Sequence, residues 1–189
     1  MRAFFREVLI IIVLALAIFA LLQVAVQNFR VEGSSMEPSI HEGQYILVNK
    51  AVYFFRFPER GEVIILHAPN TSGQDYIKRV IGIPGDTVEV SKGVVYLNGT
   101  PLAEPYIKEP PAYILSRCQV PPEHYFVLGD NRNNSADSHN GWFLSRKSIV
   151  GKAWICLWPP YSWGLAPNYQ IQVGEMGRES PPMSLVEAS

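Results

Sequence analysis

The sequence predicts a mainly β protein, in which an antiparallel β-barrel or sandwich-like domain with a smaller β extension follows one N-terminal transmembrane helix. Three observations predict it: one long apolar run near the N-terminus, many short segments rich in β-branched and aromatic residues, and turn formers between them. After the apolar run, no polar-flanked window of a dozen residues has a convincing helical period. The 189 residues, 48% of them hydrophobic, are enough for an anchor and one compact domain.

The apolar run extends from Val8 to Val26, has no charge and contains one polar side chain, Gln23. As a helix it is about 28 Å long, close to the roughly 30 Å hydrocarbon core of a bilayer. Arg2 and Arg6 precede it, so the positive-inside rule predicts a cytoplasmic segment at 1–7 and an exported remainder. No small-x-small cleavage site follows the run, which favours an uncleaved signal anchor over a cleaved signal peptide.

The domain boundaries follow from changes in composition. We expect the anchor at 8–27, one extracytoplasmic β domain at 28–165, and an extension inserted at about 94–123, where prolines are frequent. From residue 166 the sequence is polar and loses its periodicity, so we expect 166–189 to be a disordered tail.

The β domain contains seven expected strands separated by turn formers. They are 44–49, 62–67, 76–83, 87–90, 94–97, 124–128 and 149–158. Pro84-Gly85-Asp86 ends one of them, and Asn98-Gly99 is a hairpin turn signal. This spacing is typical of an antiparallel barrel or sandwich.

Charge and cysteine content exclude two classes of partner. Sixteen basic and seventeen acidic residues give a net charge of -1 with no long run of either sign, so we expect no nucleic-acid partner. Cys118 and Cys156 are far apart in sequence, and no Cys-x-x-Cys or His-rich cluster accompanies them, so we expect no metal site. The apolar surroundings of Cys156 favour two free thiols over a disulfide.

Ser35, in Gly33-Ser34-Ser35-Met36-Glu37-Pro38, lies a few residues beyond the anchor and is a candidate nucleophile. A serine in such a loop is usually a solvated turn residue, so the hypothesis depends on a base. None of the four histidines stands in a recognisable triad context; they are His41, His67, His124 and His139.

Lys78 is the other candidate base. It stands next to Arg79 on an otherwise apolar strand, and strand alternation sends the two side chains to opposite faces, so at least one points toward packed surroundings. The alternative is an ordinary surface lysine whose stem packs while its amine reaches water. A lysine acts as a base only when neutral, so its pKa of about 10.4 must fall by about two or more units, which burial supplies.

A polar loop at 129–138, reading Gly-Asp-Asn-Arg-Asn-Asn-Ser-Ala-Asp-Ser, follows an apolar strand. With the segments around Ser35 and Lys78, it resembles the bacterial type I signal peptidases, which are membrane-anchored serine proteases with a Ser/Lys dyad. The matching segments occur in the family's order and extend to Gly151. They are 33–39, 45–50, 60–63, 75–86 and 129–138.

The resemblance implies a role for each matching residue. Ser35 would be the nucleophile, Lys78 the general base, and Ser135 a residue that orients the lysine amine by a hydrogen bond. Asp137 would brace the loop. Structural ion pairs would be formed by Asp130, Arg79 and Arg132.

The oxyanion would be held by the backbone N–H of Ser35. Some relatives add a serine hydroxyl two residues earlier, where this chain has Gly33, which leaves a backbone or water donor. The family often has aspartate at the positions of Gln44 and Asn133, and arginine at that of His139. A neutral His139 would pair with Asp137 more weakly than arginine would.

The resemblance also implies the substrate and the location. The family cleaves exported preproteins after small residues, typically Ala-x-Ala, at the bacterial plasma membrane near the export channel, and needs no cofactor. Shallow apolar pockets would be lined by Phe29, Val31, Ile40, Ile46, Tyr76 and Ile77, each of which is equally explicable as core. Aromatic groups at 53–57 and 158–163 would face the membrane or pack in the core.

Two alternatives remain open. The first alternative to a signal peptidase is a relative of the self-cleaving repressor proteases, which share a Ser/Lys dyad on a β fold. The second is a catalytically silent tethered domain that binds exported proteins or cell-wall partners. The anchor and the lack of a DNA-binding domain disfavour the first, and the intact serine and lysine disfavour the second.

Overall fold

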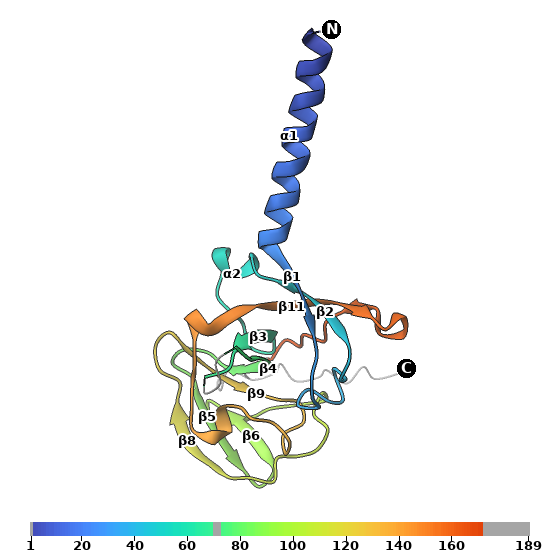
Figure 1. Ribbon diagram of the computed structural model, residues 1–189. Helices are drawn as coiled ribbons and strands as arrows, with labels where there is room; N and C mark the ends of the chain where they lie inside the picture. Colours follow the sequence, from blue (N-terminus) through green and yellow to red (C-terminus); the bar gives the residue numbers. More distant parts are fainter. Residues whose placement is uncertain (1, 70–72, 172–189) are drawn as a thin grey trace, which may run out of the picture.

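The computed structural model describes residues 2–69 and 73–171 and consists of one long helix above a β domain (Figure 1). The helices are α1 (Arg2–Ala25) and α2 (Val52–Phe55), with short 3-10 helices η1 (Ser138–Asn140), η2 (Arg146–Ser148) and η3 (Pro160–Ser162). The strands are β1 (Val26–Arg30), β2 (Tyr45–Asn49), β3 (Val63–His67), β4 (Asp75–Gly82), β5 (Thr87–Ser91), β6 (Val94–Leu97), β7 (Thr100–Pro101), β8 (Leu115–Gln119), β9 (His124–Leu128), β10 (Leu144–Ser145), β11 (Ile149–Trp158) and β12 (Gly164–Leu165).

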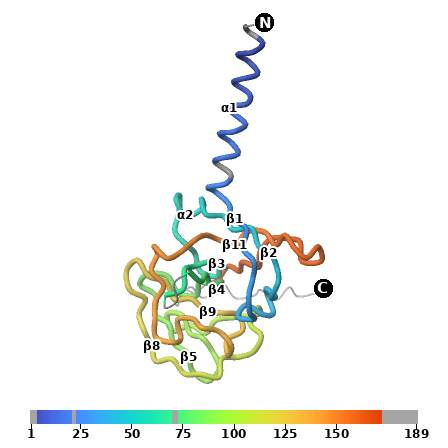
Figure 2. Tube along the Cα trace, in the orientation of Figure 1, coloured from blue at the N-terminus to red at the C-terminus, as the bar shows by residue number. Residues whose placement is uncertain are grey.

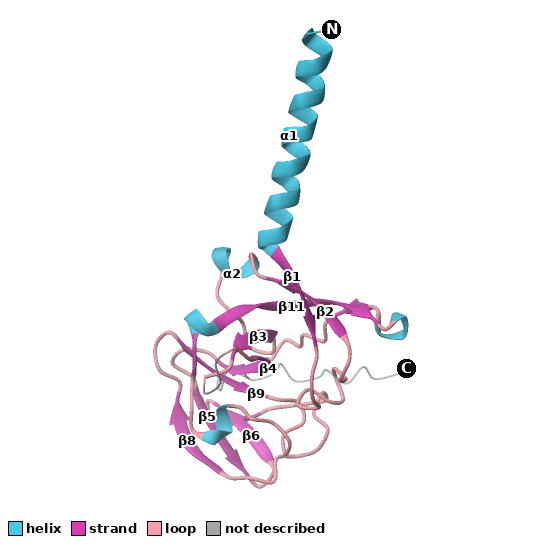
Figure 3. Cartoon of the chain, in the orientation of Figure 1, coloured by secondary structure: helices cyan, strands magenta, loops and turns pink. Residues whose placement is uncertain are grey.

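The strands form two antiparallel sheets, which confirms the predicted fold class (Figure 3). The larger sheet has the order β1-β2-β11-β3-β4-β9-β10, with β12 added to β11, and the smaller has the order β7-β6-β5-β8. One apolar cluster lies against β1, β2, β3 and β11, and a second joins the smaller sheet to β4 and β9. The candidate site lies between β1, an edge strand of the larger sheet, and the first residues of β4, which pair with β3 but not with β9.

α1 projects away from the β domain, and none of its apolar stretch is buried inside the protein (Figure 2). The stretch from Phe4 to Ala25 is long and apolar enough to cross a membrane. The helix ends at Ala25, two residues before the expected end of the span, because Val26 and Gln27 already pair with β2. The apolar run thus supplies both the helix and the first residues of β1.

All seven expected strands are present, and the sequence missed four others besides β1. Three of these, β7, β10 and β12, have only two residues each, too few for a period-2 pattern. β8 lies within the proline-rich segment, where the strand patterning predicts no strand after 94–97. The extension begins at Thr87 and not at about residue 94, because β5 pairs with both β6 and β8.

The first residues of the expected disordered tail are packed against the β domain. Ala166 is buried, the Asn168 side chain accepts a hydrogen bond from Val63 N, and Tyr169 lies over the Arg79 guanidinium. The ordered domain therefore extends to residue 171, whereas the rest of the expected tail lies outside the described residues.

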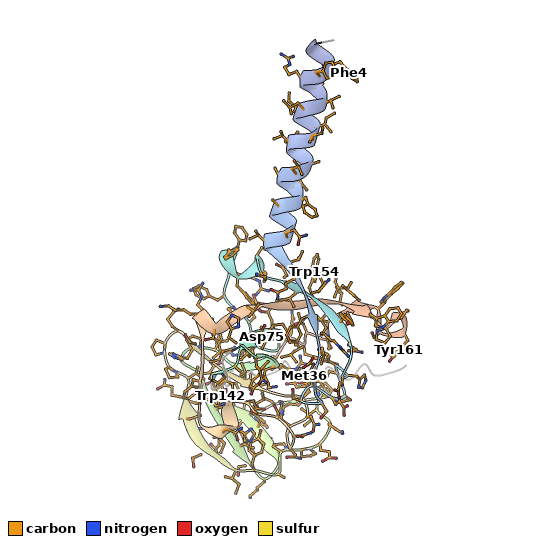
Figure 4. All side chains as sticks on the ribbon, in the orientation of Figure 1. Phe4, Met36, Asp75, Trp142, Trp154 and Tyr161 are labelled. Atoms are coloured by element: carbon orange, nitrogen blue, oxygen red, sulfur yellow. The ribbon has the colours of Figure 1, made fainter. Side chains whose placement is uncertain are left out.

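Both aromatic groups expose large rings to solvent. Phe54, Phe55 and Phe57 are exposed around α2, and Trp158, Tyr161 and Trp163 are exposed around η3. Figure 4 shows Trp154 near the base of α1 and Tyr161 at the tip of the β11–β12 hairpin. Cys118 and Cys156 are free thiols in different apolar clusters.

Candidate active site

Ser35 and Lys78 lie side by side, although 43 residues separate them in sequence. The Lys78 Nζ atom donates a hydrogen bond to Ser35 Oγ at 2.8 Å. Ser35 belongs to the loop after β1, and Lys78 stands on β4. The backbone N–H of Asn131 donates to Ser35 O at 3.0 Å, so the 129–138 loop fixes the serine against the strand.

The Lys78 side chain is buried, with only 3% of its surface exposed. Its amine makes one further hydrogen bond, to Ile77 O at 2.9 Å, and no carboxylate touches it among the described residues. Burial lowers the pKa of Lys78 to about 8, against the smaller opposing effects of the Asp137 and Asp130 charges. The amine is therefore partly neutral near neutral pH.

Arg79 is buried as well, but it is fully paired. Its guanidinium donates two hydrogen bonds to the Asp130 carboxylate, at 2.8 and 2.6 Å, and two more to Gly61 O and Pro167 O. The rings of Tyr106 and Tyr169 lie against it at 4.2 and 5.0 Å from their centroids. The expected Arg79–Asp130 ion pair is present, and it joins β4 to the 129–138 loop.

Arg132 forms an ion pair with a residue that the sequence did not indicate. Its guanidinium binds both carboxylate oxygens of Glu104, at 2.8 and 2.6 Å, and its Nε donates to Gly129 O at 3.1 Å. Asp130 is already used by Arg79, so it has no part in this pair. Glu104 lies between β7 and β8, so a charge in the extension holds the active-site loop in place.

Asp137 braces the loop as expected. Its Oδ2 accepts from Gly129 N at 2.9 Å, and its Oδ1 contacts the backbone N and the ring Nδ1 of His139 at 3.2 and 2.7 Å. The His139 ring stacks on Tyr113 with centroids 4.2 Å apart. Histidine therefore fills the position that the family often gives to arginine and keeps the contact with Asp137.

Ser135 does not make the expected hydrogen bond to Lys78. Its Oγ is buried and has no hydrogen-bond partner in the described part of the chain. The Lys78 amine is held by Ser35 Oγ and Ile77 O instead. Ser135 nevertheless lies near Ser35, because a Cβ placed on Gly129 would come within 2.4 Å of both Ser135 Oγ and Ser35 O.

Three residues that sequence reasoning left without a role hold the two loops together. Gly129 permits the close approach of the loops because it has no side chain. The side-chain amide of Asn131 donates to Ser34 O, and that of Asn134 donates to Ser34 Oγ, both at 3.0 Å. Their only sequence signal was membership of the 129–138 motif.

A groove of about 500 Å³ opens beside Ser35 between the end of β1 and the start of β4. Three of the six expected pocket residues line it, namely Phe29, Tyr76 and Ile77. The other three are core residues with at most 1% of their surface exposed and do not line it; they are Val31, Ile40 and Ile46. A second hollow of about 330 Å³ continues past Ser35 toward Asn134 and Ala136.

Gly33, two residues before Ser35, has a positive φ of 80°, and no atom lies within 4 Å of the position that its Cβ would occupy. Among the described residues, the Ser35 N–H donates no hydrogen bond to another backbone group. That N–H is thus free to bind an anion. A serine hydroxyl beside a partly neutral amine, with a free N–H nearby, is the set of groups that nucleophilic catalysis by serine needs.

Comparison with known proteins agrees with this class of site. Residues 3–158 match the family described as "Signal peptidase, peptidase S26". "Probable signal peptidase I-1" of Synechocystis sp. is 41% identical over 85% of this chain and 86% of that protein. "Signal peptidase I U" of Bacillus subtilis is 37% identical over 80% of this chain and 86% of that protein.

Among solved structures, a signal peptidase I from Enterococcus faecalis V583 is 33% identical, with a TM-score of 0.47, over 51% of this chain and 97% of that chain. From the family match and the sequence relatives, the chain belongs to the S26 signal peptidase family and is a serine endopeptidase.

Proposed function

We propose that this chain removes N-terminal signal peptides from exported preproteins, with Ser35 as nucleophile and Lys78 as general base. The observation that carries the proposal is the 2.8 Å contact between Lys78 Nζ and Ser35 Oγ at a buried amine whose pKa is lowered to about 8. The names of the sequence relatives support the choice of substrate.

The first half of the reaction forms an acyl-enzyme. Neutral Lys78 takes the hydroxyl proton of Ser35 while Oγ attacks the carbonyl carbon of the scissile peptide bond. The tetrahedral intermediate then collapses, the C–N bond breaks, and the lysine ammonium gives its proton to the leaving amine. The hydrogen bond from the amine to Ile77 O keeps the amine directed during both transfers.

The second half releases the signal peptide. Lys78, neutral again, takes a proton from water as the water oxygen attacks the acyl carbon, and the same proton returns to Ser35 Oγ when the ester bond breaks. The Ser35 N–H supplies one donor to the oxyanion in each half, and water or the Gly33 backbone supplies another. Ser135 is a positioning residue, because its unpaired buried hydroxyl is available to turn toward the amine.

The open strand edges around the groove suit an extended peptide. β1 pairs only with β2 among the described residues, and β4 pairs with β3 from Asp75 but with β9 only from Arg79 onward, so the backbone groups on one side of each strand are unpaired beside Ser35. A substrate segment bound as an added strand would satisfy these groups and would alternate its side chains between the groove and solvent. We assign cleavage after small residues of the Ala-x-Ala type to the shallow wall that Phe29, Tyr76 and Ile77 provide.

The membrane anchor places the site where the substrate arrives. α1 spans the bilayer once with its N-terminus in the cytoplasm, so the β domain lies outside the bacterial plasma membrane. Only β1 and a short loop separate the end of α1 from Ser35. The groove therefore stays close to the membrane surface, where the export channel presents a signal peptide whose helix is still in the bilayer.

The test is cleavage of one purified preprotein by wild type, Ser35→Ala and Lys78→Ala in the same detergent. We expect both variants to lose about 10⁴-fold or more in kcat/KM, since the two residues act as one unit. The matched control is Lys152→Ala, a lysine on β11 that pairs with Glu62 away from the groove. Cleavage at the wild-type rate by either dyad variant refutes the proposal, and cleavage of the chain itself but of no preprotein supports the self-cleaving alternative.

A further inference from the structure

A second pocket, of about 390 Å³, lies at the base of α1 and is separate from the catalytic groove except for Asp75. Its lining comes from the first residues of β1, the segment around α2, the facing ends of β3 and β4, and the start of β11 (Figure 1). The lining residues that matter here are Gln27, Lys50, Tyr53, Phe54 and Arg146.

Hydrogen bonds fix the depth of this pocket relative to α1. The last carbonyl of the apolar helix is Ala25 O. The backbone N–H groups of Lys50 and Ala51 both donate to it, at 2.8 and 3.4 Å. The uncharged part of α1, from Val8 to Ala25, is about 27 Å long and nearly fills a roughly 30 Å hydrocarbon core, so Ala25 lies close to the edge of that core. Lys50 therefore lies at the level of the lipid headgroups.

The charges of the pocket favour an anion. Lys50 has no ion pair in the described part of the chain, and Arg146 has only a contact of 3.7 Å with the exposed Glu123 carboxylate. One carboxylate lines the pocket, Asp75, and His67 Nδ1 contacts it at 2.6 Å. The two cations outnumber the single carboxylate, even with the imidazole neutral.

Arg56 and Lys152, the other basic groups of this region, already have carboxylate partners, because both pair with Glu62 and Arg56 also contacts Glu59 at 3.5 Å. Arg56 and Lys152 both bind the buried Glu62 carboxylate, at 2.5 and 2.6 Å, and the Tyr53 hydroxyl donates to it at 2.9 Å. Glu62 therefore does not line the pocket, and it does not compensate the charges of Lys50 and Arg146.

The rim of the pocket has the apolar groups that an acyl chain needs. Phe54 lines the pocket and is 74% exposed, and Phe55 beside it is 88% exposed. The Arg146 guanidinium lies 4.1 Å from the centroid of the Phe57 ring, so a cation and an aromatic ring share one edge. Exposed aromatic side chains beside basic ones, near the end of an apolar helix, are typical of the boundary between acyl chains and phosphates.

We propose that this pocket binds the phosphate headgroup of an anionic phospholipid, with Lys50 and Arg146 as the phosphate ligands and Phe54 against the glycerol and acyl region. The bound lipid would hold α2 against the membrane and so fix the tilt of the β domain. The proposal rests on the membrane placement of α1 and is independent of the catalytic role of Ser35 and Lys78.

The test is native mass spectrometry of the full chain in detergent micelles that contain either phosphatidylglycerol or phosphatidylcholine. We expect wild type to retain one phosphatidylglycerol in preference to phosphatidylcholine. Lys50→Gln/Arg146→Gln should lose this preference, weakening phosphatidylglycerol binding about 30-fold, at roughly fivefold per cation. The matched control is Lys92→Gln/Arg117→Gln, which removes two charges from the smaller sheet and should bind as wild type does.

Three results would overturn the proposal: equal retention of both lipids by wild type, unchanged binding by the pocket variant, or the same loss in the control variant. Glycerol 3-phosphate is added in a separate arm, and its displacement of the lipid at equal concentration would show a free-phosphate site and not a lipid site. Preprotein cleavage in phosphatidylcholine micelles should stay at the wild-type rate in the pocket variant, which separates this proposal from the proposed function.

Discussion

Lys78 and Arg79 are neighbours on β4, both are buried, and their surroundings are opposite. Arg79 has a carboxylate, two carbonyl groups and two aromatic rings around its guanidinium, so its charge is fully compensated. Lys78 has a serine hydroxyl and one carbonyl, and burial lowers its pKa to about 8. One strand therefore holds a fully paired cation beside an amine whose pKa is low enough for it to lose its proton near neutral pH.

Burial has opposite consequences at the two positions, and the partners of each side chain decide which consequence follows. Asp130 is close enough to Arg79 to bind it through both oxygens, whereas it affects Lys78 only through its charge. A carboxylate in contact with the lysine would restore the ammonium form and remove the base. Matched substitutions at the two positions should separate stability from activity.

The largest effect on stability is expected for Arg79→Met. The substitution leaves Asp130 buried without its partner, and breaking a buried ion pair in this way costs about 3–5 kcal/mol. Urea unfolding followed by tryptophan fluorescence measures the change. A loss below about 1 kcal/mol would show that Asp130 finds other partners or takes up a proton at little cost.

Lys78→Met should have the opposite effect on stability while abolishing cleavage. Folded Lys78 loses its proton at about pH 8, whereas the lysine of the unfolded chain keeps its proton up to about pH 10.5. Below about pH 8 the folded state must bury a charged ammonium, so the lysine destabilises the fold most in that range. An apolar side chain removes this cost and should raise the free energy of unfolding by about 1–3 kcal/mol. The gain should disappear above about pH 10.5, and a destabilised variant at pH 7 would contradict the account.

Ser135→Ala should lower the rate without lowering stability. The hydroxyl has no partner among the described residues, so its removal relieves an unpaired buried group and leaves the free energy of unfolding unchanged or slightly higher. We expect kcat to fall roughly tenfold through loss of lysine orientation. Ser138→Ala is the matched control, because Ser138 Oγ accepts from Val127 N and its loss should reduce stability instead. A Ser135→Ala enzyme with full kcat would remove Ser135 from the mechanism.

Asp137→Asn should produce the smallest change, a shift of the pH–rate profile to lower pH. The Asp137 charge raises the pKa of Lys78 against the effect of burial, so an amide at this position lets that pKa fall further. The amide oxygen can still accept from Gly129 N. A shift to higher pH would mean that Asp137 acts on the base mainly through the position of the loop.

Strand patterning predicted the fold class because it lies within local segments. The resemblance of three motifs to the signal peptidase family then predicted that Ser35, Lys78 and the 129–138 loop belong to one site. Neither could predict Glu104 as the partner of Arg132, since that contact depends on how the extension folds back. Asn131 and Asn134 were hidden for a similar reason, because their hydrogen bonds to Ser34 span about a hundred residues. Val31, Ile40 and Ile46 were placed in the pocket because an apolar residue near the site looks the same in sequence whether it lines a groove or fills the core.

The most direct test of the central claim is the pH dependence of kcat/KM for preprotein cleavage by wild type, which reports the pKa of the base in the free enzyme. If Lys78 is that base, the rate rises through pH about 8 and then reaches a plateau, and Lys78→Met shows no such rise at any pH. A wild-type rise centred near the ordinary histidine value of about 6.5, or cleavage by Lys78→Met at the wild-type rate, would contradict the account.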